Sequence, residues 1–579
     1  MAALVHALDS YTPTRNGENG HIEYGWSNSI QEQIVQFNFQ TTRTDNIEPL
    51  ENRLVNMLET LSDKVKNGTF LEKEVAMGHL SILYKMVGHT RDIIDGKGEY
   101  TLTYMMIYVW NRFYPKLAEF ALKCLVDLGD NSVHQYGSWK DIKYFCKYIK
   151  DRTFNYSTNN LLTYAIEITN EQISKDYYKF IMESNGISLA AKWVPREKSS
   201  FGWLFENLAT HFFSNIMLTA DTESRKQKAI LKCKTEYRKI LSSLNRQIDT
   251  VQIKQCRHKW ADINFEKTTS ITLTKQKNAF LNVKNDGHVR FPSDRDRVQC
   301  AEHFNLHIKN AVKGNVEMKG KRVGMADFTK QALDILRRNG SQAEKDLLNL
   351  QWRDNSSENG ALGNMIAMVD VSGSMDGDPI NAAIALGIRI AEKSALGKRV
   401  MTFSSSPIWI NLDPYPDFIS QVNEVKCAPW GMNTNFYAAL DLILDAIIEN
   451  KMTPEDVQDM VLVILSDMQM DEGDSCNKQA LYQTMNEKYK AAGIRVHGRA
   501  YKPPHVVFWN FRSTSGFPSL SNQHNTSMMS GFSPSLLNLF CEQGIHALQS
   551  CTPWSLLLKS LENERYTIMN DRLYQEINV

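Results

Sequence analysis

Between residues 46 and 352, apolar residues recur three and four positions apart, the spacing of the buried face of an α-helix. The first run places Leu50, Leu54 and Leu58 on one such face. Successive runs of this kind, without strand-like stretches between them, predict an all-α array of HEAT-like or solenoid type, although no strict repeat period is visible. Residues 1–45 are mainly polar and are predicted to form a weakly ordered arm.

The pattern changes after residue 352. Residues 353–363 are polar and lack periodicity, so they are predicted to link two domains. From residue 364 to 545, strand-like and helix-like stretches alternate. The strands are expected at residues 365–371, 399–403, 461–466, 506–511 and 528–532, and the helices at residues 380–394, 436–450, 478–492 and 533–543. This order predicts a doubly wound α/β domain with a mainly parallel sheet, followed by a helical tail over residues 546–579.

Oxygen-bearing side chains follow the predicted strands of this α/β domain. Asp370, Ser372 and Ser374 end the first strand, Thr434 precedes a helix, and Asp467 ends another buried strand. Ligands of open parallel sheets bind at the carboxyl ends of the strands. Carboxylates and hydroxyls without thiol or imidazole suit a hard divalent cation, which is Mg²⁺ or alternatively Mn²⁺ or Ca²⁺. The competing interpretation is a helix N-cap, in which the same side chains bind free backbone N–H groups.

Composition restricts the classes of protein that remain. The 579 residues exceed the size of a single core, and a net charge of +1 gives no global attraction for nucleic acid. The nine Cys residues include no C-x-x-C pair, which indicates reduced thiols and a cytoplasmic location. No apolar run is long enough to span a membrane, and the first residues lack the features of a secretion signal.

Positive charge is concentrated between residues 225 and 259, where eleven Lys and Arg residues stand against two acidic residues. Such a block can follow a phosphate backbone, with Tyr237, His258 and Trp260 stacking on unpaired bases. The alternative is a solvated helix face with its aromatic residues in the core. The candidate RNA-binding residues are Lys192, Arg196, Lys198, Arg225, Lys226, Lys228, Lys232, Lys234, Arg238 and Lys239.

Several ordered motifs carry a resemblance to a known family. They are Gly88–Glu99, Tyr136–Ile142, Ala191–Ser199, Tyr237–Ser242, Trp260–Ile263, Phe508–Arg512 and Met529–Pro534. They resemble domain-of-unknown-function family 2828 of plants, fungi and large DNA viruses, which joins a TROVE-like helical region to a C-terminal von Willebrand factor A domain. The order of Asp370, Ser372, Ser374, Thr434 and Asp467 resembles the metal-ion-dependent adhesion site of such A domains. That resemblance implies a cation with one open position for an anionic oxygen of a partner.

A more distant resemblance is to the Ro autoantigen, in which an A domain closes a ring of HEAT-like helices that binds RNA. It implies a ring here but transfers no individual RNA contact. No Walker loop, Gly-x-Ser-x-Gly elbow or acid–base pair stands out, so no catalytic residues are expected. The sequence therefore favours a non-catalytic RNA-binding ribonucleoprotein scaffold. The alternative is a metal-dependent protein-interaction module in a large assembly, and a virion component if the chain is viral.

Overall fold

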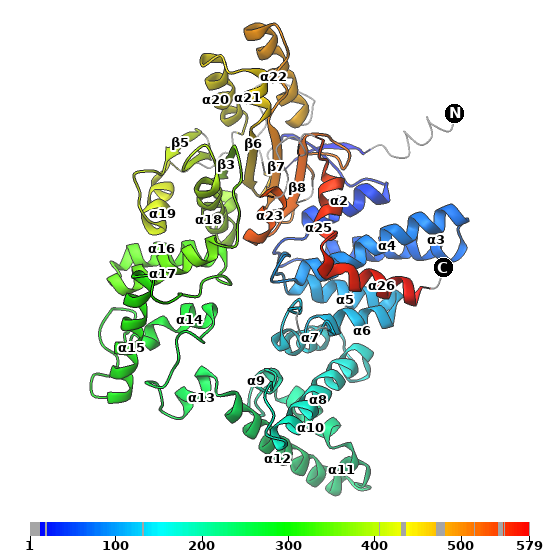
Figure 1. Cartoon of the computed structure of the whole chain (residues 1–579). Helices are drawn as coiled ribbons and strands as arrows, with labels where there is room; N and C mark the ends of the chain where they lie inside the picture. The colour runs from blue at the N-terminus through cyan, green and yellow to red at the C-terminus, as the bar shows by residue number, and fades with distance from the viewer. Residues whose placement is uncertain are drawn as a thin grey trace.

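The computed structural model describes residues 12–17, 20–129, 133–404, 406–429, 436–469, 481–514, 516–541, 548 and 550–577. An α-helical region precedes a mixed sheet of six strands (Figure 1). The helices form an arc with both ends at the sheet (Figure 1). At the first end, the helix of residues 30–40 packs on the edge strand β8, and at the second end, the helix of residues 325–338 packs on the helix that follows β3.

The first limb of the arc holds the segments before residue 249. They are β1 (Thr14–Asn16), β2 (Ile22–Tyr24), α2 (Ile30–Gln40), α3 (Glu48–Asn67), α4 (Phe70–Arg91), α5 (Thr101–Phe113), α6 (Pro115–Cys124), α7 (Trp139–Arg152), η1 (Tyr156–Thr158), α8 (Asn160–Ile181), α9 (Ala190–Trp193), α10 (Gly202–Phe212), α11 (Ser214–Leu218) and α12 (Glu223–Ile248). The second limb comprises α13 (Val251–Cys256), α14 (Ser270–Phe280), α15 (Arg295–Val312), α16 (Met325–Arg338) and α17 (Gln342–Ser356).

The sheet has the order β5-β4-β3-β6-β7-β8 and is parallel except for β5. Its strands are β3 (Met365–Asp370), β4 (Arg399–Phe403), β5 (Ile408–Asn411), β6 (Val461–Ser466), β7 (His505–Asn510) and β8 (Thr526–Ser530). The intervening helical segments are η2 (Gly373–Met375), α18 (Asp378–Lys393), α19 (Phe418–Cys427), α20 (Phe436–Glu449), α21 (Pro454–Gln458), α22 (Leu481–His497), η3 (Pro534–Leu537) and α23 (Asn538–Cys541). The predicted change from a helical to an alternating pattern is confirmed at this level.

Strand residues alternate between two apolar cores, as the period of a strand requires. Ile366 and Met368 of β3 belong to a first core, shared with α20, α22 and the first limb. Ala367 and Val369 belong to a second core, shared with α16–α19. Helices therefore cover both faces of the sheet, which explains why its central strands are buried throughout and apolar up to their last residue.

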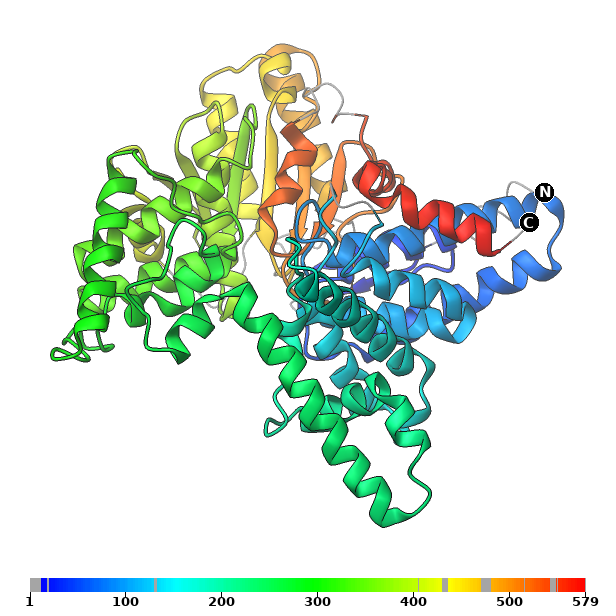
Figure 2. The same ribbon diagram turned by 60° about the horizontal axis from the view of Figure 1, so that its bottom comes forward.

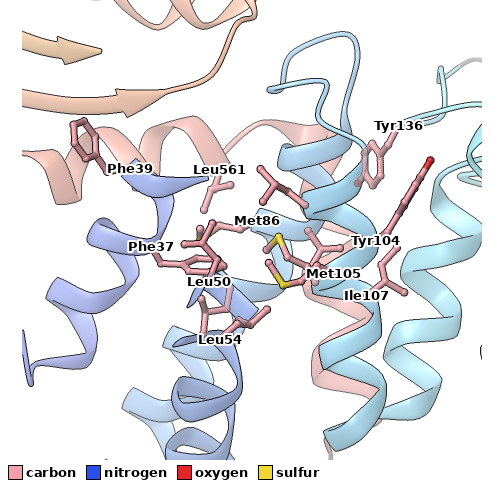
Figure 3. Packing of buried hydrophobic residues seen from close by; sticks show 14 of the residues in the cluster. Phe37, Phe39, Leu50, Leu54, Met86, Tyr104, Met105, Ile107, Tyr136 and Leu561 are labelled. Atoms are coloured by element: carbon pink, nitrogen blue, oxygen red, sulfur yellow. The ribbon is translucent and has the colours of Figure 1, made fainter. Parts of the chain in front are cut away.

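The prediction of a weakly ordered arm over residues 1–45 is wrong for the part that the structure describes. Phe37 and Phe39 of α2 are fully buried, and Figure 3 shows Phe37 directed toward Leu50 of α3 and Met86 of α4. The polar residues that suggested an arm are buried too, because distant groups satisfy them: Gln36 donates to the carbonyl oxygen of Gly25 at 2.9 Å.

The predicted linker 353–363 is also partly wrong. Helix α17 continues to Ser356, and Asn355 and Asn359 are buried. Both amides accept from Nη1 of Arg389 in α18, at 3.1 and 2.9 Å. This segment therefore packs the last helix of the arc against the sheet.

The predicted C-terminal tail contains the helical segments α25 (Pro553–Leu561), η4 (Glu564–Tyr566) and α26 (Thr567–Glu576). They return to the first limb and pack on α4 and α6 (Figures 1 and 2). Leu557, Leu561, Met569 and Leu573 are buried in the first core. Within the described residues, no helix is both long and apolar enough to cross a membrane.

The two limbs have separate cores. Ile248, at the end of α12, packs on the first core, whereas Val251, at the start of α13, packs on a third core made by α14, α15 and α17. Between them Asp249 has φ +46°, a left-handed conformation that Asp tolerates better than most residues. The chain thus changes core within three residues.

Candidate metal site and basic surface

Four of the five predicted metal donors lie at the carboxyl edge of the sheet. Asp370 ends β3 and Asp467 follows the last residue of β6, and these two strands are parallel neighbours. The turn after β3 carries Ser372 and Ser374, whose hydroxyl oxygens are 3.0 Å apart. Thr434 lies outside the residues that the structure describes.

The carboxylate of Asp370 is held by local donors. Its Oδ1 accepts from the backbone N–H of Ser372 at 2.9 Å, and its Oδ2 accepts from the Ser466 hydroxyl at 2.6 Å. Asp370 and Asp467 are both fully buried. Burial, together with the negative charge of Asp467, raises the pKa of Asp370 to about 7. A divalent cation between the two carboxylates would offset this repulsion, so the donor set fits a hard cation.

The competing N-cap interpretation holds in part. Ser372 is the N-cap residue of η2, and the carboxylates of Asp370 and Asp467 each accept from a backbone N–H two residues further on. The N-cap of α18, however, is Gly377, and neither η2 nor α18 has a side-chain cap hydrogen bond. Ser374 is half-buried and Gly373 is exposed, so solvent reaches the turn that carries the hydroxyl donors.

Arg512 lies beside these donors, although no sequence motif predicted a role for it in the site. Its Nη1 donates to the carbonyl oxygen of Ser374 at 2.8 Å and lies 3.8 Å from Oδ2 of Asp467. Half of its side chain is exposed. One feature of the sequence could have indicated this position, because Arg512 follows β7 and therefore lies at the same edge of the sheet. The indication was weak, since Arg512 has no fixed spacing from the other motifs.

Asp378 joins both limbs of the arc to the sheet. Its carboxylate pairs with Arg43, which follows α2, at 3.1 Å, and with Lys330 of α16. Its neighbour Asp376 is exposed. Asp378 is therefore a structural ion-pair residue at the start of α18.

The predicted basic block falls mainly on α12, the long helix at the far end of the arc (Figure 2). We define the α12 stripe as the exposed cations Arg225, Lys228, Lys232, Lys239 and Arg246. Their separations of three, four, seven and seven residues place them on one face of the helix. The stripe extends over about 30 Å at 1.5 Å per residue.

Two cations of the stripe form ion pairs, Arg225 with Asp221 at 2.7 Å and Lys239 with Glu236 at 2.8 Å. The other candidate cations do not belong to this row. Lys234 is largely buried and pairs with Glu197 and Glu206, each at 3.2 Å. Arg238 is exposed and also pairs with Glu197, at 2.9 Å. Lys192 is half-buried, and this burial lowers its pKa. The remaining three candidates, Arg196, Lys198 and Lys226, are exposed.

The expected stacking role of Tyr237 is wrong. Its ring is fully buried, and its hydroxyl donates to Asn170 of α8 at 2.8 Å. Trp260 is half-buried, with the guanidinium of Arg297 at 3.7 Å from its ring centroid. Of the three aromatic candidates, only His258 is exposed.

The motif at residues 88–99 is structural. Arg91 and Asp141 form a fully buried pair with bonds of 2.6 and 3.0 Å. Asp92 accepts two bonds from Arg565 in the C-terminal tail, each of 2.7 Å. Gly88 packs so closely on the ring of Tyr136 that a side chain would not fit there. These motif residues hold the tail and α7 against α4.

Comparison with known proteins places the chain in a family. Residues 166–358 match the model of a domain of unknown function, DUF2828, and residues 364–566 match a second one, DUF7788. The chain is 30% identical over 512 residues to "Uncharacterized protein L728" of Acanthamoeba polyphaga mimivirus, over 85% of this chain and 80% of the viral protein. The chain therefore belongs to the DUF2828 family, with this viral protein as a relative.

Proposed function

We propose that this protein is a non-catalytic RNA-binding scaffold, in which a TROVE-like ring of HEAT-like helices is closed by a von Willebrand factor A-like unit. The observation that carries the proposal is the α12 stripe, a straight row of exposed cations in a chain of net charge +1. A phosphate backbone is the extended polyanion that such a row fits, and binding would be sensitive to salt and largely independent of sequence. A cytoplasmic or virion location is compatible with this role.

The test is a salt titration of RNA binding by fluorescence anisotropy, with a labelled hairpin that ends in a single strand. The variant Lys228→Gln/Lys232→Gln/Lys239→Gln removes three cations of the stripe. It is expected to weaken binding at low salt by about tenfold or more, and to reduce the slope of log K against log salt by about one for each lysine that contacts a phosphate.

The matched control is Lys64→Gln/Lys66→Gln/Lys313→Gln, which removes the same charge from exposed lysines outside the stripe. It should bind RNA almost as the wild type does. Equal losses in the two triple variants would mean that only net charge matters, and would contradict a binding role for α12.

A second candidate function is cation-dependent capture of a protein partner. It is favoured by the convergence of Asp370, Ser372, Ser374 and Asp467 on one sheet edge. The cation would be Mg²⁺, Mn²⁺ or Ca²⁺, and its open position would take an anionic oxygen of the partner. These four residues would hold the cation, with Thr434 as the fifth donor that the A-domain resemblance implies.

Calorimetric titration with Mn²⁺ tests this candidate. Asp370→Asn keeps the size of the side chain but removes a charge, and is expected to weaken Mn²⁺ binding by at least about tenfold. Asp376→Asn changes an exposed acid six residues further on and serves as the control.

A pull-down experiment tests whether any protein partner depends on the cation. Wild type and Ser372→Ala are each compared in the presence of Mg²⁺ and in the presence of a chelator. Identical sets of partners in all four samples would contradict this function.

A further inference from the structure

A groove of about 620 Å³ with a mixed polar and apolar lining begins one residue from Arg512, which contacts the turn of the candidate metal site. It is bounded by the end of α2, the first turns of α3 and the segment that follows β7. No role has been assigned to it so far, and neither the metal donors nor the α12 stripe belong to its walls.

Two chain segments connect the groove to the metal-site turn. Arg43 pairs with the acidic first residue of α18, and the next residue, Thr44, lines the groove. Arg512 donates to the carbonyl oxygen of Ser374, and the two residues after it line the opposite wall. Residues next to the groove walls therefore contact the turn that carries the hydroxyl donors and the helix that follows it.

The segment that carries Arg512 is fixed by buried amides. Oδ1 of Asn510 accepts from the backbone N–H of Arg512 at 3.0 Å, and its Nδ2 donates to the carbonyl oxygen of Phe39 at 2.9 Å. Oε1 of Gln40 accepts from the backbone N–H of Thr514 at 2.6 Å. Asn510 and Gln40 are fully buried, so α2 holds this backbone while the Arg512 side chain remains half exposed. Such preorganisation reduces the entropic cost of binding.

Two kinds of polar group lie in the groove or next to it. Next to Ser513 of its wall, the fork of Arg512 lies 3.8 Å from the Asp467 carboxylate and matches the geometry of a carboxylate ligand. Along the wall, Asn52 and Asn56 are exposed and lie one turn apart on α3. Each amide offers a donor and an acceptor, which is what the backbone of an extended peptide requires. Arg53, over the ring of Trp26 at 4.6 Å, is a cation that lines the groove itself.

We propose that the groove and the metal-site turn form one binding surface for an extended peptide segment of a partner protein that carries an acidic side chain. Arg512 binds one oxygen of that carboxylate while the cation takes the other, and the α3 amides bind the peptide backbone. The inference rests on the second candidate function, because the cation is part of the surface. It adds the class of ligand, the direction in which the ligand extends, and a role for Arg512 in specificity.

The experiment selects peptides from a random phage-displayed library on the full chain in Mg²⁺, with elution by a chelator. The expected result is enrichment of sequences with one Asp or Glu at a fixed position. A synthetic peptide of the enriched sequence should bind the wild-type protein about tenfold or more weakly when its acidic residue is replaced by the corresponding amide. The unchanged peptide should lose a similar amount of affinity for the protein variants Arg512→Gln and Asn52→Asp/Asn56→Asp. The control Asn155→Asp/Asn315→Asp adds the same charge at exposed positions outside the groove and should retain peptide binding.

Mn²⁺ titration of the same variants distinguishes failure of the cation site from failure of the peptide-binding surface. Arg512→Gln should bind Mn²⁺ at least as tightly as the wild type, because a neighbouring positive charge is removed. If the wild type does not bind Mn²⁺, the second candidate function fails, and the inference fails with it. If Mn²⁺ binds but no acidic peptide is enriched, or the enriched peptide ignores Arg512 and the α3 amides, the inference alone is overturned.

Discussion

At the scale of single residues, buried charge pairs join segments that lie far apart along the chain. Arg91 and Asp92, neighbours in the motif at residues 88–99, have different partners. Asp141, the partner of Arg91, lies 50 positions away, and Arg565, the partner of Asp92, lies 473 positions away. No local sequence pattern predicts either contact. The convergence of Asp370 and Asp467 was more predictable, because parallel neighbouring strands bring their carboxyl ends to one edge.

The buried pair of Arg91 and Asp141 gives a prediction about stability. Arg91→Leu leaves the Asp141 charge buried without its partner and is expected to cost about 3–5 kcal/mol. Arg91→Leu/Asp141→Leu removes both charges and should cost clearly less than the single change. Urea unfolding of the two variants measures the difference; equal costs would mean that the pair acts only through packing.

Lys97 gives a prediction about pH. It is fully buried, and its ammonium donates to the carbonyl oxygen of Asn38 at 2.8 Å, the hydroxyl of Thr41 at 2.6 Å and the hydroxyl of Ser530 at 2.8 Å. Burial lowers its pKa from 10.5 to about 7. Between these two values the unfolded chain binds more protons than the folded one, so this residue makes stability rise with pH.

The comparison of wild type with Lys97→Met isolates this contribution. From pH 7 upward to about pH 9, the free energy of unfolding of the wild type should rise relative to the variant, by up to about 1.4 kcal/mol per pH unit. Below pH 7 the difference should be flat, because Lys97 is then charged in both states. Denaturant unfolding across this range measures it; parallel curves above pH 7 would show that the buried amine keeps an ordinary pKa.

At the scale of elements, periodicity predicted the central strands closely and failed where burial depends on distant partners. The strand expected at residues 399–403 coincides with β4, and that at 461–466 coincides with β6. β5 was missed because it is a short edge strand with two exposed residues of four. Helix α2 was missed because its Gln and Asn residues look solvated. Gln36, however, binds the backbone of Gly25 and Ser27, and Gln40 binds the backbone N–H of Thr514, 474 residues away.

Helix α2 supports a prediction about packing. Phe37→Ala removes a fully buried ring from the first core and is expected to destabilise the protein by about 3–5 kcal/mol. Phe154→Ala, at a fully exposed ring, is the control and should change stability by no more than about 0.5 kcal/mol. Thermal unfolding compares them. Similar effects in the two variants would contradict the burial of α2.

At the scale of the whole molecule, both ends of the helical arc and the sheet meet at a few polar contacts. Arg43 and Lys330 converge on Asp378, and Arg322 donates to the carbonyl oxygen of Ile93 at 2.9 Å. No sequence pattern could have paired these residues, since each is an ordinary surface charge within its own segment. The groove beside the metal-site turn was unpredictable for the same reason, because its walls come from segments more than 400 residues apart.

The change of core at Asp249 has a consequence for how the polypeptide can be divided. Residues before it pack with α26 and β8, and residues after it build the sheet, so a break at this point would cut one backbone bond and leave both packing surfaces intact. Two fragments, 1–249 and 250–579, are therefore expected to reassemble into a stable heterodimer when they are expressed together. Co-purification on a tag carried by one fragment would reveal this, and recovery of the tagged fragment alone would mean that the uninterrupted chain is needed for assembly.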